Sequence, residues 1–288
     1  MKLAGRWAWW NENSDRSFNL DLCVRRAKDA RLVGAIIKWG YPKTEQAFTA
    51  AGIPWAVERY VKYSQPEVEG QRLANAVGVG AVAAIINAEE GGDEQTGGHW
   101  ERDTDGQAMR TLIATFRQRC PDIELYASVD TRGDRLNDPY QRVLAQHIAG
   151  WLPMVYPLAF RPNRPSGFVT RAFADCLDGK DFGGIPVLPT IQTYDGIGKQ
   201  AVVDELAEVK RRGLPGCQAY TIPHATDEEW AEFAKEALVI PTPTSTWDED
   251  KKALDIYKML WDLNKVLAAG DLQLLANKLA RVGVRATV

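Results

Sequence analysis

The chain has 288 residues, and 35 lysines and arginines against 38 aspartates and glutamates give it a net charge of −3. No basic stripe runs along the sequence, which argues against a nucleic-acid-binding surface. No apolar run is long enough to cross a bilayer, and residues 1–7 lack the apolar core of a signal peptide. We therefore expect a protein made in the cytosol, with later release or association with a phage particle left open.

Eight short apolar runs, each followed by a stretch with helical periodicity, repeat along most of the chain. Strands that alternate with helices in this rhythm pair in parallel, and eight such units predict a closed (β/α)₈ barrel, or TIM barrel, over residues 1–240. The predicted strands are 3–9, 33–38, 53–60, 81–89, 123–130, 151–156, 185–194 and 217–222. Active sites of such barrels lie at the carboxyl ends of the strands, so polar residues there are candidates for chemistry.

A Pro/Thr-rich linker, 241–247, follows the predicted barrel. Residues 248–288 then show two amphipathic helical patterns separated by a Gly-Asp pair. A helical hairpin of this size cannot bury its apolar faces alone. We expect it to pack on the barrel, on another copy of itself in a homo-oligomer, or on a protein partner.

The best candidate for chemistry is the end of the fourth predicted strand. Asn87 and Glu89 are two residues apart, so both side chains point to the same face of the strand, into the barrel mouth. A carboxylic acid at an apolar rim can have its pKa raised by desolvation, which suits it to protonate a leaving oxygen. The neighbouring amide can stabilise a group that becomes partly charged in the transition state.

Glycosidases that use two carboxylates need a second acid across the sugar. The seventh predicted strand, where such an acid is expected, contains no glutamate. Asp130, at the end of the fifth strand, is the first alternative partner, and Glu58, near the end of the third, is the second. Each of them could equally pair with a nearby arginine or lysine.

Several aromatic residues fall at or just after predicted strand ends. A flat ring beside polar groups suits a sugar, whose C–H faces stack on apolar planes while its hydroxyls need hydrogen bonds; the alternative is that these rings fill the barrel mouth. Together with polar residues at the same level they form the predicted substrate-binding set: Trp9, Trp39, Glu58, Gln192, Tyr194 and Tyr220.

Two short motifs resemble known glycoside hydrolases. Asn87-x-Glu89 resembles the pair at the end of strand four in endo-β-N-acetylglucosaminidase barrels, where the substrate's own acetamido oxygen is the nucleophile. Met154-x-Tyr156 is similar to the Met-x-Tyr of chitinase-like barrels. The resemblance implies that Glu89 is the general acid/base, and that Asn87 and Tyr156 contact the acetamido group.

This chain also departs from those families. Pro157 stands where the chitinases carry Asp, and their Asp-x-x-Asp-x-Asp-x-Glu motif is absent. Strands four and eight, the latter with Gln218-Ala219-Tyr220-Thr221, also resemble phage lysozyme-type, endolysin-like barrels, but Asn87 stands where those have Asp.

Other mechanisms have less support in the sequence. His99, His147 and His224 show no metal-ligand spacing, and there is neither a Gly-x-Ser-x-Gly elbow nor a dinucleotide fingerprint. We expect no metal and no cofactor.

The sequence therefore predicts a glycoside hydrolase acting on an N-acetylhexosamine-containing polysaccharide, such as peptidoglycan or a chitin-like glycan. Its catalytic set is Glu89, Asn87, Asp130 and Tyr156. The alternative is a non-catalytic barrel that binds carbohydrate or serves in assembly, which the missing second carboxylate favours.

Overall fold

The computed structural model describes residues 1–10, 20–78, 80–88 and 98–235, all of which belong to the unit Met1–Ile240. The predicted barrel end at residue 240, the linker 241–247 and the helical hairpin 248–288 lie outside the described residues and stay predictions.

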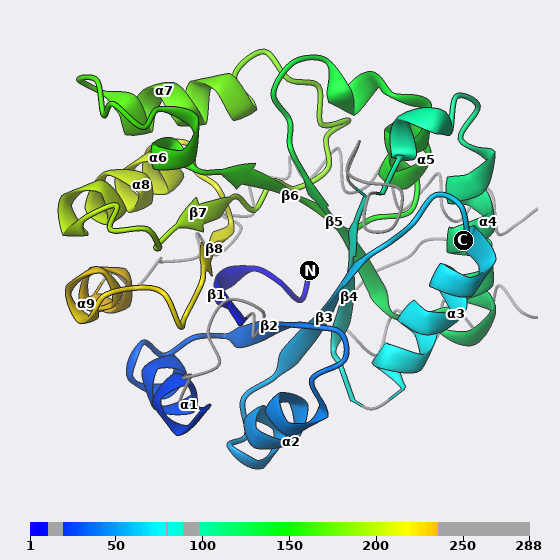
Figure 1. Cartoon of the computed structure of the whole chain (residues 1–288), viewed down its shortest axis with the longest axis horizontal. Coiled ribbons are helices and arrows are strands. Elements are labelled where there is room, and N and C mark those ends of the chain that lie inside the picture. Colours follow the sequence, from blue (N-terminus) through cyan, green and yellow to red (C-terminus); the bar gives the residue numbers. More distant parts are fainter. Residues whose placement is uncertain (11–19, 79, 89–97, 236–288) are drawn as a thin grey trace, which may run out of the picture. The chain divides into compact units, whose positions relative to one another are not determined.

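Eight parallel strands form a closed barrel in which each strand pairs with the next along the chain and β8 pairs with β1. The predicted (β/α)₈ fold is confirmed. Figure 1 shows the strands in the middle of the molecule with the helices outside them. The strands are β1 Gly5–Trp10, β2 Gly34–Lys38, β3 Trp55–Tyr60, β4 Ala83–Asn87, β5 Glu124–Val129, β6 Gly150–Val155, β7 Thr190–Gln192 and β8 Gly216–Tyr220.

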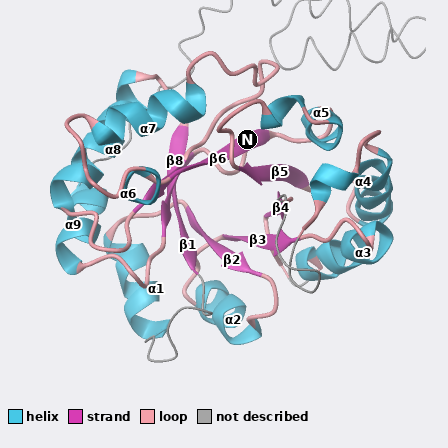
Figure 2. Ribbon diagram, turned by 45° about the horizontal axis from the view of Figure 1, so that its top comes forward, coloured by secondary structure: helices cyan, strands magenta, loops and turns pink. Residues whose placement is uncertain are grey.

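The helices of the described part surround this barrel, as Figure 2 shows in a second view. None of them is both long and apolar enough to cross a membrane. They are α1 Leu20–Asp29, α2 Pro42–Ala50, α3 Pro66–Val77, α4 Gln107–Arg119, α5 Pro139–Ala145, α6 Pro157–Phe160, α7 Phe168–Leu177, α8 Lys199–Arg211 and α9 Asp227–Lys235, with 3₁₀ turns η2 Trp100–Arg102 and η3 Arg135–Asn137.

Alternation along the strands divides the apolar side chains into two clusters. Residues on the inner face, including Trp7, Ile36 and Tyr126, fill the barrel interior, while residues of the opposite parity pack under the helices. At Gly34 the interior leaves no room for a side chain, because an added Cβ would lie 2.4 Å from Cζ3 of Trp7. The barrel interior is therefore a packed core, and a ligand can bind at the carboxyl ends of the strands.

Strand β7 is the shortest of the eight, with three residues. The sequence predicted a strand over 185–194, but Pro186 and Pro189 interrupt it. A proline has no N–H to donate to the ladder. One isolated bridge, Trp151 to Val187, extends the pairing below β7. The short strand still brings Gln192 level with Tyr220 on β8.

Candidate active site

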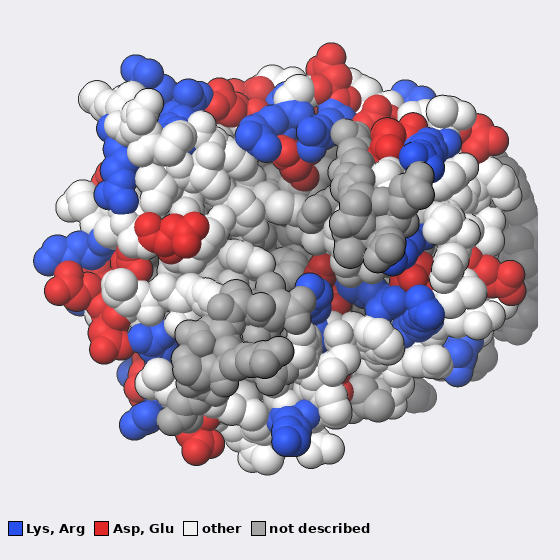
Figure 3. Space-filling view, viewed as in Figure 1, with Lys and Arg blue, Asp and Glu red and all other residues white. Residues whose placement is uncertain are grey.

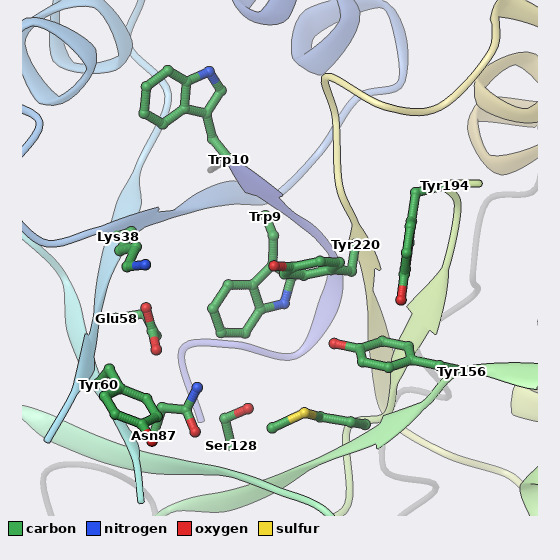
Figure 4. A pocket seen from close by; sticks show the side chains of 11 residues that line it. Trp9, Trp10, Lys38, Glu58, Tyr60, Asn87, Ser128, Tyr156, Tyr194 and Tyr220 are labelled. Carbon is green, nitrogen blue, oxygen red and sulfur yellow. The ribbon is translucent and has the colours of Figure 1, made fainter. Parts of the chain in front are cut away.

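A cavity of about 320 Å³, here called the main cavity, opens at the carboxyl ends of the strands. Figure 4 shows most of its side chains pointing toward one another from around the barrel, while the Trp10 ring points away from them. Six of them are aromatic, four are polar and one is a methionine. They are Trp9, Trp10, Lys38, Glu58, Tyr60, Asn87, Ser128, Met154, Tyr156, Tyr194 and Tyr220.

Strand register explains why the polar residues meet. Tyr60, Asn87 and Ser128 are successive partners across β3, β4 and β5, so they stand at one level of the barrel. One step lower on the neighbouring pair, Lys38 on β2 is the partner of Glu58 on β3. Each of these five residues stands two positions after a residue whose side chain faces the barrel interior. Their side chains therefore also point inward and lie above the apolar interior.

Four aromatic rings form the floor and one wall of the main cavity. Trp9 is 5 % exposed and its indole lies under Tyr220, with ring centroids 5.8 Å apart. Tyr220 in turn lies 5.6 Å from both Tyr156 and Tyr194. Burial, with the nearby carboxylates, raises the pKa of Tyr194 to about 12, so its hydroxyl stays protonated at neutral pH. These flat surfaces suit the C–H faces of a sugar ring.

Three polar atoms of residues that line this cavity have no hydrogen-bond partner. They are Oδ1 of Asn87 and the Nε1 atoms of Trp9 and Trp10, all buried. A buried acceptor or donor without a partner costs roughly 1–3 kcal/mol, so a ligand that supplies the complementary groups would recover this energy. An acetamido group carries both an N–H donor and a carbonyl acceptor.

The charged groups among the lining residues are Lys38 and Glu58, which Figure 4 shows on the same side of the main cavity. Glu58 is 4 % exposed. Among the described residues, Glu58 is thus the acid that lines the main cavity, whereas the sequence predicted Asp130 first and Glu58 second as the partner acid.

The structure brings together most of the predicted site. Asn87 and Tyr156 of the predicted catalytic set line the main cavity, as do Trp9, Glu58, Tyr194 and Tyr220 of the predicted substrate-binding set. Glu89, the predicted general acid/base, lies outside the described residues. It follows Asn87 by two positions.

Asp130 does not line the main cavity. Its carboxylate receives hydrogen bonds from Arg132 Nε at 2.9 Å and NH2 at 2.7 Å, and from Arg135 NH1 at 2.9 Å. Burial alone would raise the pKa of Asp130, but these hydrogen bonds and charges outweigh it and hold the pKa below its usual value. An acid held ionised in this way is a poor proton donor, and its position suits support of the β5 loop.

Gln192 also lies outside the main cavity and is fully buried. Its Oε1 accepts a hydrogen bond from the amide of Leu158 at 2.9 Å, at the start of α6. The backbone N–H of Gln192 donates to Oε1 of Glu205 at 3.0 Å. Gln192 therefore holds the start of α6 in place. Tyr156 directly precedes this helix and lines the main cavity, so Gln192 supports the cavity through Tyr156.

Trp39 stands on the rim just after β2 and is 39 % exposed. The guanidinium of Arg59 lies over its ring, 4.3 Å from the centroid, and donates from Nε to the buried Glu69 at 2.5 Å. One side of the indole is thus supported by protein. This arrangement fits the predicted stacking role, although Trp39 does not line the main cavity itself.

Five lining residues were not in the predicted site: Trp10, Lys38, Tyr60, Ser128 and Met154. For Lys38, Tyr60 and Ser128 the signal was available, because each stands two residues beyond an inward-facing residue near a strand end. Trp10 has the opposite parity and packs edge-on against Tyr41, 5.3 Å away. Parity alone could not place it.

Other kinds of site have little support in the described part of the chain. There, no group of three or more His, Cys, Asp or Glu side chains is arranged to hold a metal ion. The face seen in Figure 3 carries lysines and arginines interspersed with aspartates and glutamates, and shows no broad field of one sign.

No protein-family model matches the sequence, and no curated protein matches it. Solved structures share its fold. A chitinase from Chromobacterium violaceum ATCC 12472 is 12 % identical and has a TM-score of 0.55, covering 80 % of this chain and 98 % of its own. An endoglucanase from Pseudomonas stutzeri is 10 % identical with a TM-score of 0.53, covering 83 % and 96 %. The spore cortex-lytic enzyme SleL from Bacillus megaterium QM B1551 is 6 % identical with a TM-score of 0.50, covering 80 % and 73 %.

These similarities establish that the chain has a glycoside hydrolase-like TIM barrel. At such low identities they establish the fold alone. The function has to be argued from the site.

Proposed function

We propose that this protein is a glycoside hydrolase that cleaves an N-acetylhexosamine-containing polysaccharide, either peptidoglycan or a chitin-like glycan. The observation that carries the proposal is the Asn87 amide in an aromatic cavity at the end of β4, with its Oδ1 buried and unpartnered. Glu89 follows two positions later in the sequence. A chitinase and a cortex-lytic enzyme among the fold neighbours agree with this substrate class.

In the proposed reaction, the acetamido carbonyl oxygen of the bound sugar attacks C1 while Glu89 protonates the departing glycosidic oxygen. The C1–O bond breaks and a cyclic oxazolinium forms on the sugar. Glu89, now ionised, then takes a proton from water as the water oxygen attacks C1 and reopens the ring, which restores both the enzyme and the acetamido group. The substrate itself supplies the nucleophile, so a second catalytic carboxylate is not required.

The residues of the main cavity have clear parts in this scheme. Asn87 Oδ1 accepts the acetamido N–H, which orients the carbonyl oxygen toward C1. The protonated hydroxyl of Tyr194 and the hydroxyl of the neighbouring Tyr156 belong to the wall where donors to that oxygen are needed. Trp9 provides the flat floor for the sugar ring.

Hydrolysis of matched oligomers tests the proposal. The wild-type protein is incubated with chitin oligomers, peptidoglycan and cellulose oligomers, and newly formed reducing ends are measured. Because the mechanism needs the acetamido group, we expect cleavage of N-acetylated substrates and none of cellulose oligomers, which lack it. Equal cleavage of both kinds would contradict the proposed mechanism.

The alternative function is a non-catalytic carbohydrate-binding barrel. One observation favours it: Glu58 is the carboxylate that lines the main cavity among the described residues, and Asp130 is held by two arginines. This alternative predicts that N-acetylated oligomers bind with no release of reducing ends.

A further inference from the structure

A second, smaller cavity lies beside the main one at the carboxyl end of the barrel. Its volume is about 150 Å³, and it is bounded by the ends of β4 and β5 together with η3 and α5. Met154 lines both cavities, so the two cavities are neighbours at this residue.

The interior of the second cavity has one unmet polar group. Gln141 on α5 is 2 % exposed, and its Oε1 is buried without a hydrogen-bond partner. A buried carbonyl oxygen in this state lacks a donor, which costs free energy unless a bound molecule supplies one. Tyr140 and Val129, both almost fully buried, add apolar surface beside it.

The rim of the second cavity is fixed by a network of charges. Asp130 and Arg135, both lining residues, are joined by a hydrogen bond of 2.9 Å. Arg132 donates to both carboxylate oxygens of Asp130, and its guanidinium lies over the ring of Phe160, 3.9 Å from the centroid. Because the carboxylate and the guanidinium of the rim already pair with each other, this wall favours a neutral polar occupant over an ion.

We propose that the second cavity binds the neighbouring sugar of the glycan chain whose reacting sugar occupies the main cavity. This inference rests on the proposed function. Gln141 Oε1 accepts a hydrogen bond from a hydroxyl or an acetamido N–H of that sugar, and Arg135 donates one to its oxygen atoms. Tyr140 and Val129 contact its C–H face. The substrate is thus a linear chain long enough to pass Met154, and chain length is read at this point.

Binding of a length series tests the inference. The full chain carrying Glu89→Gln, which keeps the oligomers intact under the proposed mechanism, is titrated calorimetrically with N-acetylglucosamine oligomers from the dimer to the hexamer. Gln141→Met is added to the same background, because methionine keeps the length of the side chain and removes its acceptor. The matched control is Gln146→Met, an exposed glutamine just after the same helix.

We expect Gln141→Met to weaken binding of the longer oligomers by roughly 2- to 10-fold, the worth of one hydrogen bond, and to leave the shortest unchanged. Gln146→Met should change neither. The unfolding temperature of Gln141→Met should equal or exceed that of the parent, since an unpaired buried acceptor is removed.

Two results would overturn the inference: an equal loss at every chain length, or no loss at any. If no oligomer binds the parent protein, the proposed function itself fails, and the inference fails with it. The length series therefore separates the two failures.

Discussion

Replacing Asp130 by asparagine distinguishes a supporting role from a catalytic one. The carboxylate accepts three side-chain hydrogen bonds of 2.7–2.9 Å from two arginines. Such charge-assisted bonds contribute about 1.5–3 kcal/mol each when buried. Arg132 and Arg135 are 45 % and 42 % exposed, so solvent screening brings the expected loss for the whole cluster down to about 1–2 kcal/mol.

The loss should depend on pH with a defined sign. The folded-state pKa of Asp130 lies below its unfolded value, so its contribution is present above the unfolded pKa of about 3.9 and is lost as the pH falls through the folded value. Urea unfolding of wild type and Asp130→Asn should therefore differ at pH 7 and converge in acid. Asp178→Asn is the control, because Asp178 pairs with Arg212 but is 59 % exposed, and its loss should stay below about 1 kcal/mol.

Activity completes this test. On a short oligomer that fits the main cavity, Asp130→Asn should keep turnover within about threefold of wild type, because Asp130 does not line that cavity. A catalytic acid or base contributes about 100- to 10,000-fold. A fall of that size with unchanged stability would refute the supporting role and restore Asp130 as a catalytic partner.

Two further predictions concern the scaffold. Burial raises the folded-state pKa of Glu205 well above its usual value, so folding takes up a proton above pH about 4.3. Glu205→Gln removes this cost and keeps the acceptor for the backbone N–H of Gln192. The substitution should therefore raise the urea midpoint at pH 7 and lose this advantage in acid. Unchanged midpoints at pH 7 would contradict the raised pKa of Glu205. Gly34→Ala should lower stability by about 1–3 kcal/mol, because its Cβ would meet Trp7 at 2.4 Å; an unchanged melting temperature would show that Trp7 can move.

The barrel could be predicted from the sequence because each strand is a short apolar run followed by helical periodicity. The main cavity could be predicted in part for the same reason, since residues such as Asn87 and Tyr220 stand at strand ends with inward parity. The length of β7 was harder to judge. Pro186 and Pro189 interrupt the apolar run 185–194, but the segment still lies beside β6, as the bridge between Trp151 and Val187 shows.

The polar residues that the sequence analysis placed in the cleft but the structure places elsewhere share a physical cause. Asp130 has Arg132 and Arg135 nearby in the sequence, and ion pairing with them turns the carboxylate toward the β5 loop. Gln192 satisfies backbone groups at the start of α6. Strand parity indicates which residues can reach a site, whereas local hydrogen-bond partners decide which of them do.

The most direct test of the proposed function compares Glu89→Gln with Glu90→Gln in an assay for reducing ends released from chitin oligomers and peptidoglycan. The two substitutions are chemically identical and adjacent, but on the strand predicted from the sequence only Glu89 shares the parity of Asn87. We predict that wild type and Glu90→Gln release reducing ends while Glu89→Gln does not. Release by Glu89→Gln at the wild-type rate would contradict the account, and so would silence from a folded wild type.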